Sequence, residues 1–336
     1  MQYVVHEFLK SGPVGGPNAE LLLRFNPYSL TLLDGSSTAV TELKARFVQD
    51  NVTIIQGDFL SGIPDESFDL IIAEGCLPGQ KIPGAVLSKI SEHVAINGQI
   101  IFTTQTSVSL LAEILRRIIT KVVLENSKAT LENKVDVLVA YFKPSLDSLI
   151  GMSRPYKDWV IDVLIHPWEN GCHVFNADQA LEAVGKNFDV VACRPELFLD
   201  QSWYKQDLGG FSNNTLGFKA RYTTASAILI DYRLNSPRTS ELSVDEAELL
   251  EARCASVYIL HNRFNPKSEK DNQELLKELR LISDLIQSVF PQTYNALMDF
   301  IESYPKLLAN PTTQVFGSFH EWFGRGQQYL SVIRNY

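Results

Sequence analysis

The chain has 336 residues, of which 45% are hydrophobic and 21% charged, so it can bury a core and is neither disordered nor fibrous. Its 30 Lys and Arg residues and 39 Asp and Glu residues give a net charge of −9. This acidity argues against nucleic acid as a substrate, because phosphate backbones are bound by basic surfaces. The four cysteines form no CxxC pair, and no signal peptide or apolar run of about 20 residues is present, so we expect a soluble, cytoplasmic protein.

Up to about residue 104, short β-rich segments alternate with helical patterns. We expect strands over residues 3–8, 30–33, 52–55, 68–73 and 99–104, and helices over 19–25, 38–49 and 85–94. The strand segments are almost continuously apolar, which is typical of strands covered on both faces. The alternation therefore predicts an α/β fold with a parallel sheet between layers of helices.

The alternation stops at residue 105. Residues 105–185 contain long helical patterns, and we expect them to form a helical insertion after the fifth strand. Strand-like sequence returns at 188–192 and at 226–230. These two segments are expected to form an antiparallel hairpin at the edge of the sheet.

The last third of the chain is expected to be helical. Residues 235–240 are polar, and a capping-box pattern from Ser243 to Glu246 follows them. We therefore expect a sheet domain over residues 1–235, which includes the insertion, and a helical region over 236–336. Apolar stripes along the C-terminal helices are typical of core helices or of helices that bind a partner, and a homodimer through them is one interpretation.

The first expected strand is followed by a glycine-rich turn. Gly12, Gly15 and Gly16 lie in this turn, and Asp34 follows the second strand. Such a turn at a helix N-terminus lets a nucleotide approach the backbone, and an acidic residue after the next strand binds ribose hydroxyls. The pattern predicts a nucleoside site, although glycines also occur in such turns for steric reasons alone.

Acidic residues follow four consecutive expected strands. They are Glu7, Asp34, Asp58 and Glu74. Because parallel strands end at the same edge of a sheet, these carboxylates are expected to converge on one crevice. Taken singly, each also fits a helix N-cap or a solvated loop, so the prediction depends on their joint placement.

Four runs of sequence in the first part of the chain carry a resemblance to a known family. They are EFLKSGPVGGPNAELLL, LTLLDGSS, IIQGDFLSGIPDESFDLIIAEGCL and VLSKISEHVAINGQIIFTT. Together they resemble a class I S-adenosylmethionine-dependent methyltransferase. The resemblance implies a Rossmann-like, mostly parallel sheet of seven strands that the expected edge hairpin closes. It also implies S-adenosylmethionine as the cofactor, and it reaches loosely to about residue 235.

The resemblance implies a role for the residues of the glycine-rich turn. The methionine part of the cofactor would be held by Glu7, Ser11, Gly12, Gly15 and Gly16. The family places a glycine two residues after the acidic one, whereas this chain has Leu9 there. Either the loop carries an insertion or Glu7 is not the true counterpart. The usual N-terminal covering helices are also missing before the first strand, so another segment is expected to supply the lid.

The resemblance also assigns the later strand ends. Asp34, beside Gly35, would bind the ribose hydroxyls. Asp58 and Phe59 would contact the adenine. The sulfonium side of the cofactor would be lined by Glu74 and Gly75.

The densest polar and aromatic stretch, residues 153–168, lies in the insertion. Read as a helix, it places Asp158, Asp162 and His166 on one face. In one interpretation it is a substrate lid, with His166 as the general base because histidine titrates nearest neutrality, and Asp162 beside it as a second catalytic residue. In the other, these residues only stabilise the helix dipole. We expect no metal site, because one helix face offers too few ligands.

The sequence thus predicts a methyltransferase that transfers a methyl group to oxygen or nitrogen of a small molecule, such as a sugar or related metabolite. A nicotinamide-dependent oxidoreductase could use the same glycine loop and Asp34. The expected hairpin and the lack of a Tyr-x-x-x-Lys pair after the fourth strand argue against it. A third interpretation is a catalytically silent module whose C-terminal helices bind a partner. We expect neither a nucleic-acid nor a membrane partner.

Overall fold

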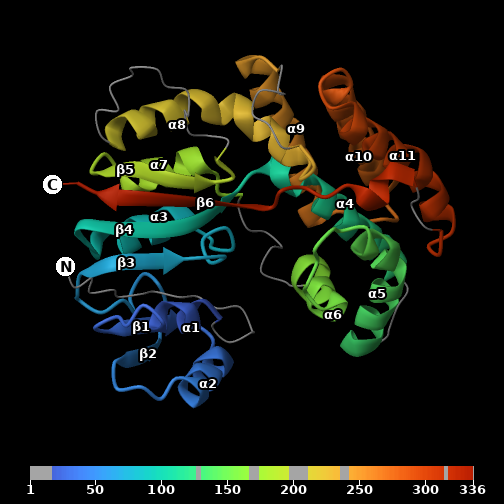
Figure 1. Cartoon of the computed structure of the whole chain (residues 1–336). Coiled ribbons are helices and arrows are strands. Elements are labelled where there is room, and N and C mark those ends of the chain that lie inside the picture. Colours follow the sequence, from blue (N-terminus) through green and yellow to red (C-terminus); the bar gives the residue numbers. More distant parts are fainter. Residues whose placement is uncertain are drawn as a thin grey trace. The chain divides into compact units, whose positions relative to one another are not determined.

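The computed structural model describes residues 17–125, 130–165, 174–196, 211–234, 242–313 and 317–335. The chain forms two compact units (Figure 1). The first comprises Met1–Gln105, Cys172–Tyr222 and Gln327–Tyr336, and the second comprises Thr106–Gly171 and Thr223–Gly326. These boundaries differ from the expected division near residue 235. Most of the expected insertion, Thr106–Gly171, groups with the C-terminal helices, whereas its last part and the end of the chain group with the sheet.

The first unit contains the strands. β1 (Leu30–Asp34) pairs in parallel with β2 (Val52–Gln56), and β3 (Phe68–Ala73) pairs in parallel with β4 (Val94–Gln105). β6 (Gln327–Arg334) and β5 (Phe188–Arg194) extend this second pair into a sheet of the order β3-β4-β6-β5. The parallel strands and the mixed α/β class are confirmed. The strand expected over residues 3–8 lies outside the described residues.

Helices α1 (Pro17–Leu23) and α2 (Ser37–Arg46) pack with β1 and β2 around a small apolar cluster. α2 begins where it does because the Ser36 hydroxyl accepts the Ala39 N–H at 3.3 Å and caps the helix. Ile72 of β3 packs against the same cluster, so β3 lies next to the β1–β2 layer. The cluster comprises Ala19, Leu30, Leu32, Leu43 and Phe47.

The remaining helices of the first unit accompany β3–β6. α3 (Pro83–Glu92) and α7 (Ala177–Val184) pack against each other, and both contact β4. A capping box between Asn176 and Gln179 starts α7. α8 (Phe211–Ser226) follows β5 (Phe188–Arg194) in the chain.

The expected antiparallel hairpin is wrong. Residues Ala227–Ile230 form a 3-10 helix rather than a strand, and each of them is at most 1% exposed. A short, continuously apolar run fits a buried helix segment as well as a buried strand, and here the helical packing prevails. β5 instead pairs with β6 (Gln327–Arg334), which lies between β4 and β5 and runs antiparallel to both.

β6 also corrects the expectation that residues 236–336 are helical to the end. Its side chains alternate in burial: Gln328, Leu330 and Val332 are buried, whereas Gln327, Tyr329 and Ser331 are partly exposed. This period of two is the period of a strand.

The second unit is helical. α4 (Ser107–Val123) has 14 of its 17 residues buried and packs against α9 (Val244–Arg263), so it forms the centre of this unit. The expected capping box from Ser243 to Glu246 is confirmed at the start of α9. In the part of the chain that the structure describes, none of the helices has the length and apolar character needed to cross a membrane.

α10 (Glu269–Ile286) and α11 (Pro291–Ala309) complete the second unit with α5 (Leu131–Asp147). The apolar stripe of α10, formed by Leu275, Leu279, Ile282 and Ile286, is fully buried. Since α10 packs between α9 and α11, this stripe belongs to the core of the second unit and does not face a partner. A dimer through the C-terminal helices stays a prediction and would have to use other residues.

The segment Phe319–Gly326 crosses α4 at close range. A Cβ atom at Gly324 would lie 1.9 Å from the Ser109 carbonyl oxygen, a backbone atom in the first turn of α4. The neighbouring Gly326 N–H donates to the same carbonyl at 3.2 Å. Gly324 therefore lets the chain lie directly on the buried helix.

We expect Gly324→Ala to lower the free energy of unfolding by about 1–3 kcal/mol, because overpacking forces the backbone apart. Thermal denaturation followed by circular dichroism measures the effect. Gly84→Ala in α3 is the matched control, since its nearest neighbour would be an ordinary 3.8 Å away and alanine favours helices. An unchanged melting temperature for Gly324→Ala would contradict the close crossing.

Candidate functional site

Asp34 is the last residue of β1 and is only 2% exposed. Its Oδ1 accepts the Ser36 N–H at 2.8 Å, which fixes the carboxylate at the turn into α2. Its backbone carbonyl accepts the Gly57 N–H at 3.1 Å, which joins the ends of β1 and β2. A buried carboxylate held by a backbone donor at a strand end is a rigid hydrogen-bond acceptor, as a ribose diol requires.

The loop after β2 is closed by its own glycines. The Gly62 N–H donates to the Asp58 carbonyl at 2.6 Å, and a Cβ at Gly62 would lie 2.9 Å from the Gly57 Cα. The Asp58 side chain is exposed, and its Oδ1 accepts the Leu60 N–H at 2.7 Å. Phe59 is buried at 5% exposure. The loop thus presents Asp58 next to the end of β1, while Phe59 anchors it in the core.

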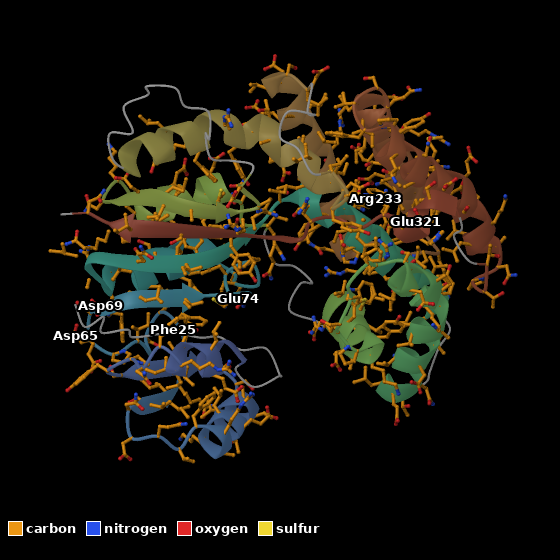
Figure 2. The ribbon with its side chains drawn as sticks, viewed as in Figure 1. Phe25, Asp65, Asp69, Glu74, Arg233 and Glu321 are labelled. Atoms are coloured by element: carbon orange, nitrogen blue, oxygen red, sulfur yellow. The ribbon has the colours of Figure 1, made fainter. Side chains whose placement is uncertain are left out.

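Glu74 and Gly75 directly follow β3 and are both half-buried. Figure 2 shows Glu74 at the carboxyl end of β3, whereas Asp65 and Asp69 lie at the opposite end. The Gly75 N–H donates to the Thr103 hydroxyl at 2.8 Å, and Gly75 has a φ of +64°, a conformation that favours glycine. Glu74 is therefore carried on a turn that a buried residue of β4 fixes.

The structure adds Tyr329 to this group. Its hydroxyl donates to Glu74 Oε1, and burial, together with the hydrogen bond to this carboxylate, raises the pKa of Tyr329. Tyr329 is consequently a neutral O–H donor near neutral pH. Sequence reasoning missed it, because β6 was expected to be helical. The aromatic and β-branched residues Tyr329, Val332 and Ile333, which favour strands, were the signal that could have placed it on one.

The expected site residues fall into three groups. Asp34, Gly35 and Asp58 meet through the Asp34–Gly57 backbone bond. Glu74 and Gly75 lie with Thr103 and Tyr329 at the ends of β3 and β4. The third group lies outside the described residues and comprises Glu7, Ser11, Gly12, Gly15, Gly16 and His166, whereas Phe59 is buried in the loop after β2 and Asp162 lies in the second unit.

The comparisons with known proteins bear on this sheet. Residues 9–102 match the family model of a methyltransferase domain. The resemblance to methyltransferases is confirmed for this segment. The matched methyltransferase segment contains Asp34, Asp58 and Glu74, and it ends within β4. No curated protein matches the chain.

Solved structures show only limited likeness. The N-methyltransferase NodS from Bradyrhizobium japonicum WM9, in complex with S-adenosyl-L-homocysteine, is 19% identical over 31% of this chain and 55% of its own, with a TM-score of 0.29. An S-adenosylmethionine-dependent methyltransferase from Mesorhizobium loti is 16% identical over 33% of this chain and 51% of its own, with a TM-score of 0.30. This chain therefore covers about half the length of these two enzymes.

The [4+2]-cyclase SpnF aligns over 99% of this chain and 75% of its own length, at 13% identity and a TM-score of 0.37. At such TM-scores, neither this alignment nor the two methyltransferase alignments carries a structural argument. The resemblance to methyltransferases therefore rests on the family match over residues 9–102.

Asp162, the other expected catalytic residue, belongs to the second unit, outside the methyltransferase segment. The expected regular helix here is instead α6 (Tyr156–Trp159) followed by a π-helix over Val160–Ile165. Asp162 forms an ion pair with Arg154.

The second unit also buries charged groups that sequence reasoning did not single out. The Arg116 guanidinium lies over the Phe323 ring at 3.8 Å and donates to the Phe319 and His320 carbonyls at 3.3 Å. Burial lowers the pKa of Arg116 to about 10. These contacts attach the segment before β6 to α4, which is a structural role.

His261 of α9 is 2% exposed and lies beside two cations of α4. Burial, and then the charges of Lys121 and Arg117, lower the pKa of His261 to about 3, against a small opposing effect from Asn262. Lys121 Nζ donates to the His261 carbonyl. His261 is therefore buried in its neutral form.

This burial makes stability pH-dependent. In the unfolded chain His261 becomes protonated below about pH 6.5, whereas in the folded chain it stays neutral down to about pH 3. The free energy of unfolding therefore falls as the pH falls from about 6.5 to about 3. Between pH 7 and pH 5.5 the wild type should lose about 1 kcal/mol more than His261→Gln. Urea unfolding at both pH values measures the difference, and equal losses would show that His261 is not buried in its neutral form.

Proposed function

We propose that this protein is an S-adenosylmethionine-dependent methyltransferase that acts in the cytoplasm on oxygen or nitrogen of a small-molecule acceptor, such as a sugar or related metabolite. The observation that carries the proposal is Asp34, a buried carboxylate held by the Ser36 N–H at the end of β1, inside the segment that matches a methyltransferase domain. The strand ends around it supply the acceptor groups that the cofactor needs.

The residues present fit the cofactor. Carboxylates lie at the end of β1 and just after β2 and β3, and they offer acceptors for hydroxyl and amino groups and a negative charge for a sulfonium. Glycines accompany them: Gly35 and Gly75 follow Asp34 and Glu74, and Gly62 closes the Asp58 loop where a side chain would clash. These acceptor groups and close backbone turns suit a nucleoside with a positively charged tail.

Each strand end has its own part in the proposal. When bound, S-adenosylmethionine supplies a methyl group activated by a sulfonium. Asp34 binds the ribose hydroxyls, Asp58 and Phe59 hold the adenine, and the loop Ser11–Gly16 with Glu7 holds the methionine part. Glu74 and Gly75 line the sulfonium side. In-line displacement needs alignment and exclusion of water more than acid–base chemistry, so fixed side chains suit it.

A hydroxyl acceptor also loses a proton when its oxygen bonds to the methyl carbon. We propose His166 as the base that takes this proton, on a lid formed by part of the 105–185 insertion, with Asp162 as its partner. The proposal rests on the sequence pattern of residues 153–168 and on the ion pair that fixes Asp162. Dimer formation through the C-terminal helices is not needed for it.

The cofactor assignment predicts the outcome of calorimetry. S-adenosylhomocysteine should bind the wild type, and Asp34→Asn should weaken it at least about tenfold, or about 1.4 kcal/mol, because the ribose loses a charged acceptor. Asp189→Asn is the matched control, since Asp189 of β5 bonds Thr215 and Asn335 within the same unit and should leave the affinity unchanged. Binding of NAD instead would overturn the proposal, and binding of neither ligand would indicate a silent module.

The lid assignment predicts a split between binding and turnover. His166→Ala should leave S-adenosylhomocysteine affinity unchanged and lower methyl transfer to a hydroxyl acceptor by about a hundredfold or more. Transfer of labelled methyl from S-adenosylmethionine to a panel of sugars and amines identifies the acceptor and gives the rate. If His166→Ala retains the full rate on that acceptor, His166 has no catalytic role.

A further inference from the structure

The last strand contributes a side chain to the candidate site. Tyr329 of β6 donates its hydroxyl to Glu74 Oε1, although the two residues stand 255 positions apart in the sequence. Tyr329 is half-buried, and its neighbours Gln328 and Leu330 are fully buried, so the backbone that carries it is fixed within the sheet. The carboxylate that follows β3 is therefore held from a second, rigid strand.

The register of β4 and β6 shows how Glu74 is fixed from two sides. Thr103 of β4 lies directly opposite Tyr329. The Thr103 hydroxyl accepts the Gly75 N–H at 2.8 Å and so holds the backbone after Glu74. Tyr329 holds the carboxylate itself. Gln327, on the same face of β6 as Tyr329, has its Nε2 3.7 Å from the position of a Cβ at Gly75, so it limits this turn further.

We propose that Tyr329 is a positioning residue that holds the Glu74 carboxylate toward the sulfonium, so that the site prefers the charged methyl donor to its neutral product. This inference rests on the proposed function. To the proposed function the inference adds Tyr329, a residue outside the matched methyltransferase segment, and a physical reason why the product leaves the site.

The physical reason is the charge difference between the two ligands. S-adenosylmethionine carries a positive sulfonium, whereas S-adenosylhomocysteine has a neutral thioether and otherwise the same groups. A carboxylate a few ångströms away stabilises only the first of them. The position of the carboxylate decides the size of the effect, because the interaction weakens with distance and with exposure to water. Tyr329 fixes that position, and as a neutral donor it adds no charge of its own.

Calorimetry with S-adenosylmethionine and S-adenosylhomocysteine tests the proposal on the full chain. The measured quantity is the ratio of the two dissociation constants, product over donor. Glu74→Gln should lower this ratio by about tenfold, because the charge is lost. Tyr329→Phe, which keeps the ring, should lower it by about threefold, because the charge stays but is no longer fixed.

The double variant separates positioning from a structural role. If Tyr329 acts through Glu74, Tyr329→Phe should change nothing further once Glu74→Gln is in place. Additive effects on the ratio would overturn the proposal. So would a Tyr329→Phe variant that weakens both ligands equally, which is what a purely structural role produces.

Tyr304→Phe serves as the matched control. Tyr304 of α11 is a fully buried tyrosine whose hydroxyl, like that of Tyr329, donates to a side chain, here to Asn272 Oδ1 at 2.6 Å. Loss of the Tyr304 hydroxyl should lower the melting temperature and leave the ratio of the two dissociation constants unchanged. If the wild type binds neither ligand, the proposed function fails and this inference fails with it. If the wild type binds both and the ratio is insensitive to Glu74→Gln, only this inference fails.

Discussion

The first unit depends on the pairing of its last strand with two strands from earlier in the chain. β6 hydrogen-bonds to β4 along one edge and to β5 along the other. Without it, β5 would lose the only neighbour that the described sheet gives it, and each buried backbone group left unpaired costs about 1–3 kcal/mol. The same strand carries Tyr329 to Glu74. The fold and the candidate site therefore depend on one set of backbone contacts.

The candidate site follows from where parallel strands end. β1 with β2, and β3 with β4, each run in the same direction, so the turns after β1 and β2 lie at one end of their pair and those after β3 and β4 at one end of theirs. Backbone donors fix the two central groups there: the Ser36 N–H holds the Asp34 carboxylate, and the Gly75 N–H bonds Thr103. Groups held by backbone and strand contacts lose little freedom on binding, and this is the preorganisation that methyl transfer needs.

The second unit uses buried charge for a different purpose. Arg116 lies on the Phe323 ring and bonds backbone carbonyls, while the Glu251 carboxylate of α9 accepts the Ser107 and Val108 N–H groups at the start of α4. Burial raises the pKa of Glu251, and these N–H groups oppose that shift. Each charged group satisfies backbone atoms of a neighbouring segment, so these charges fasten the helices around α4.

The sequence by itself determined the local elements and the residues at their ends. Continuous apolar runs placed β1, β2, β3 and β5, and the acidic residues after the first three of them marked the candidate site. It did not determine which distant segments pair. An apolar run, Ala227–Ile230, was taken for the strand, whereas the true partner of β5 was the segment Gln327–Arg334, whose polar and apolar residues do not alternate. A local sequence pattern indicates which residues are buried and whether a segment is helical or extended. Which strands pair is decided by backbone hydrogen bonds between residues far apart in the chain. For that reason the bond from Tyr329 to Glu74 could be found only in the tertiary structure.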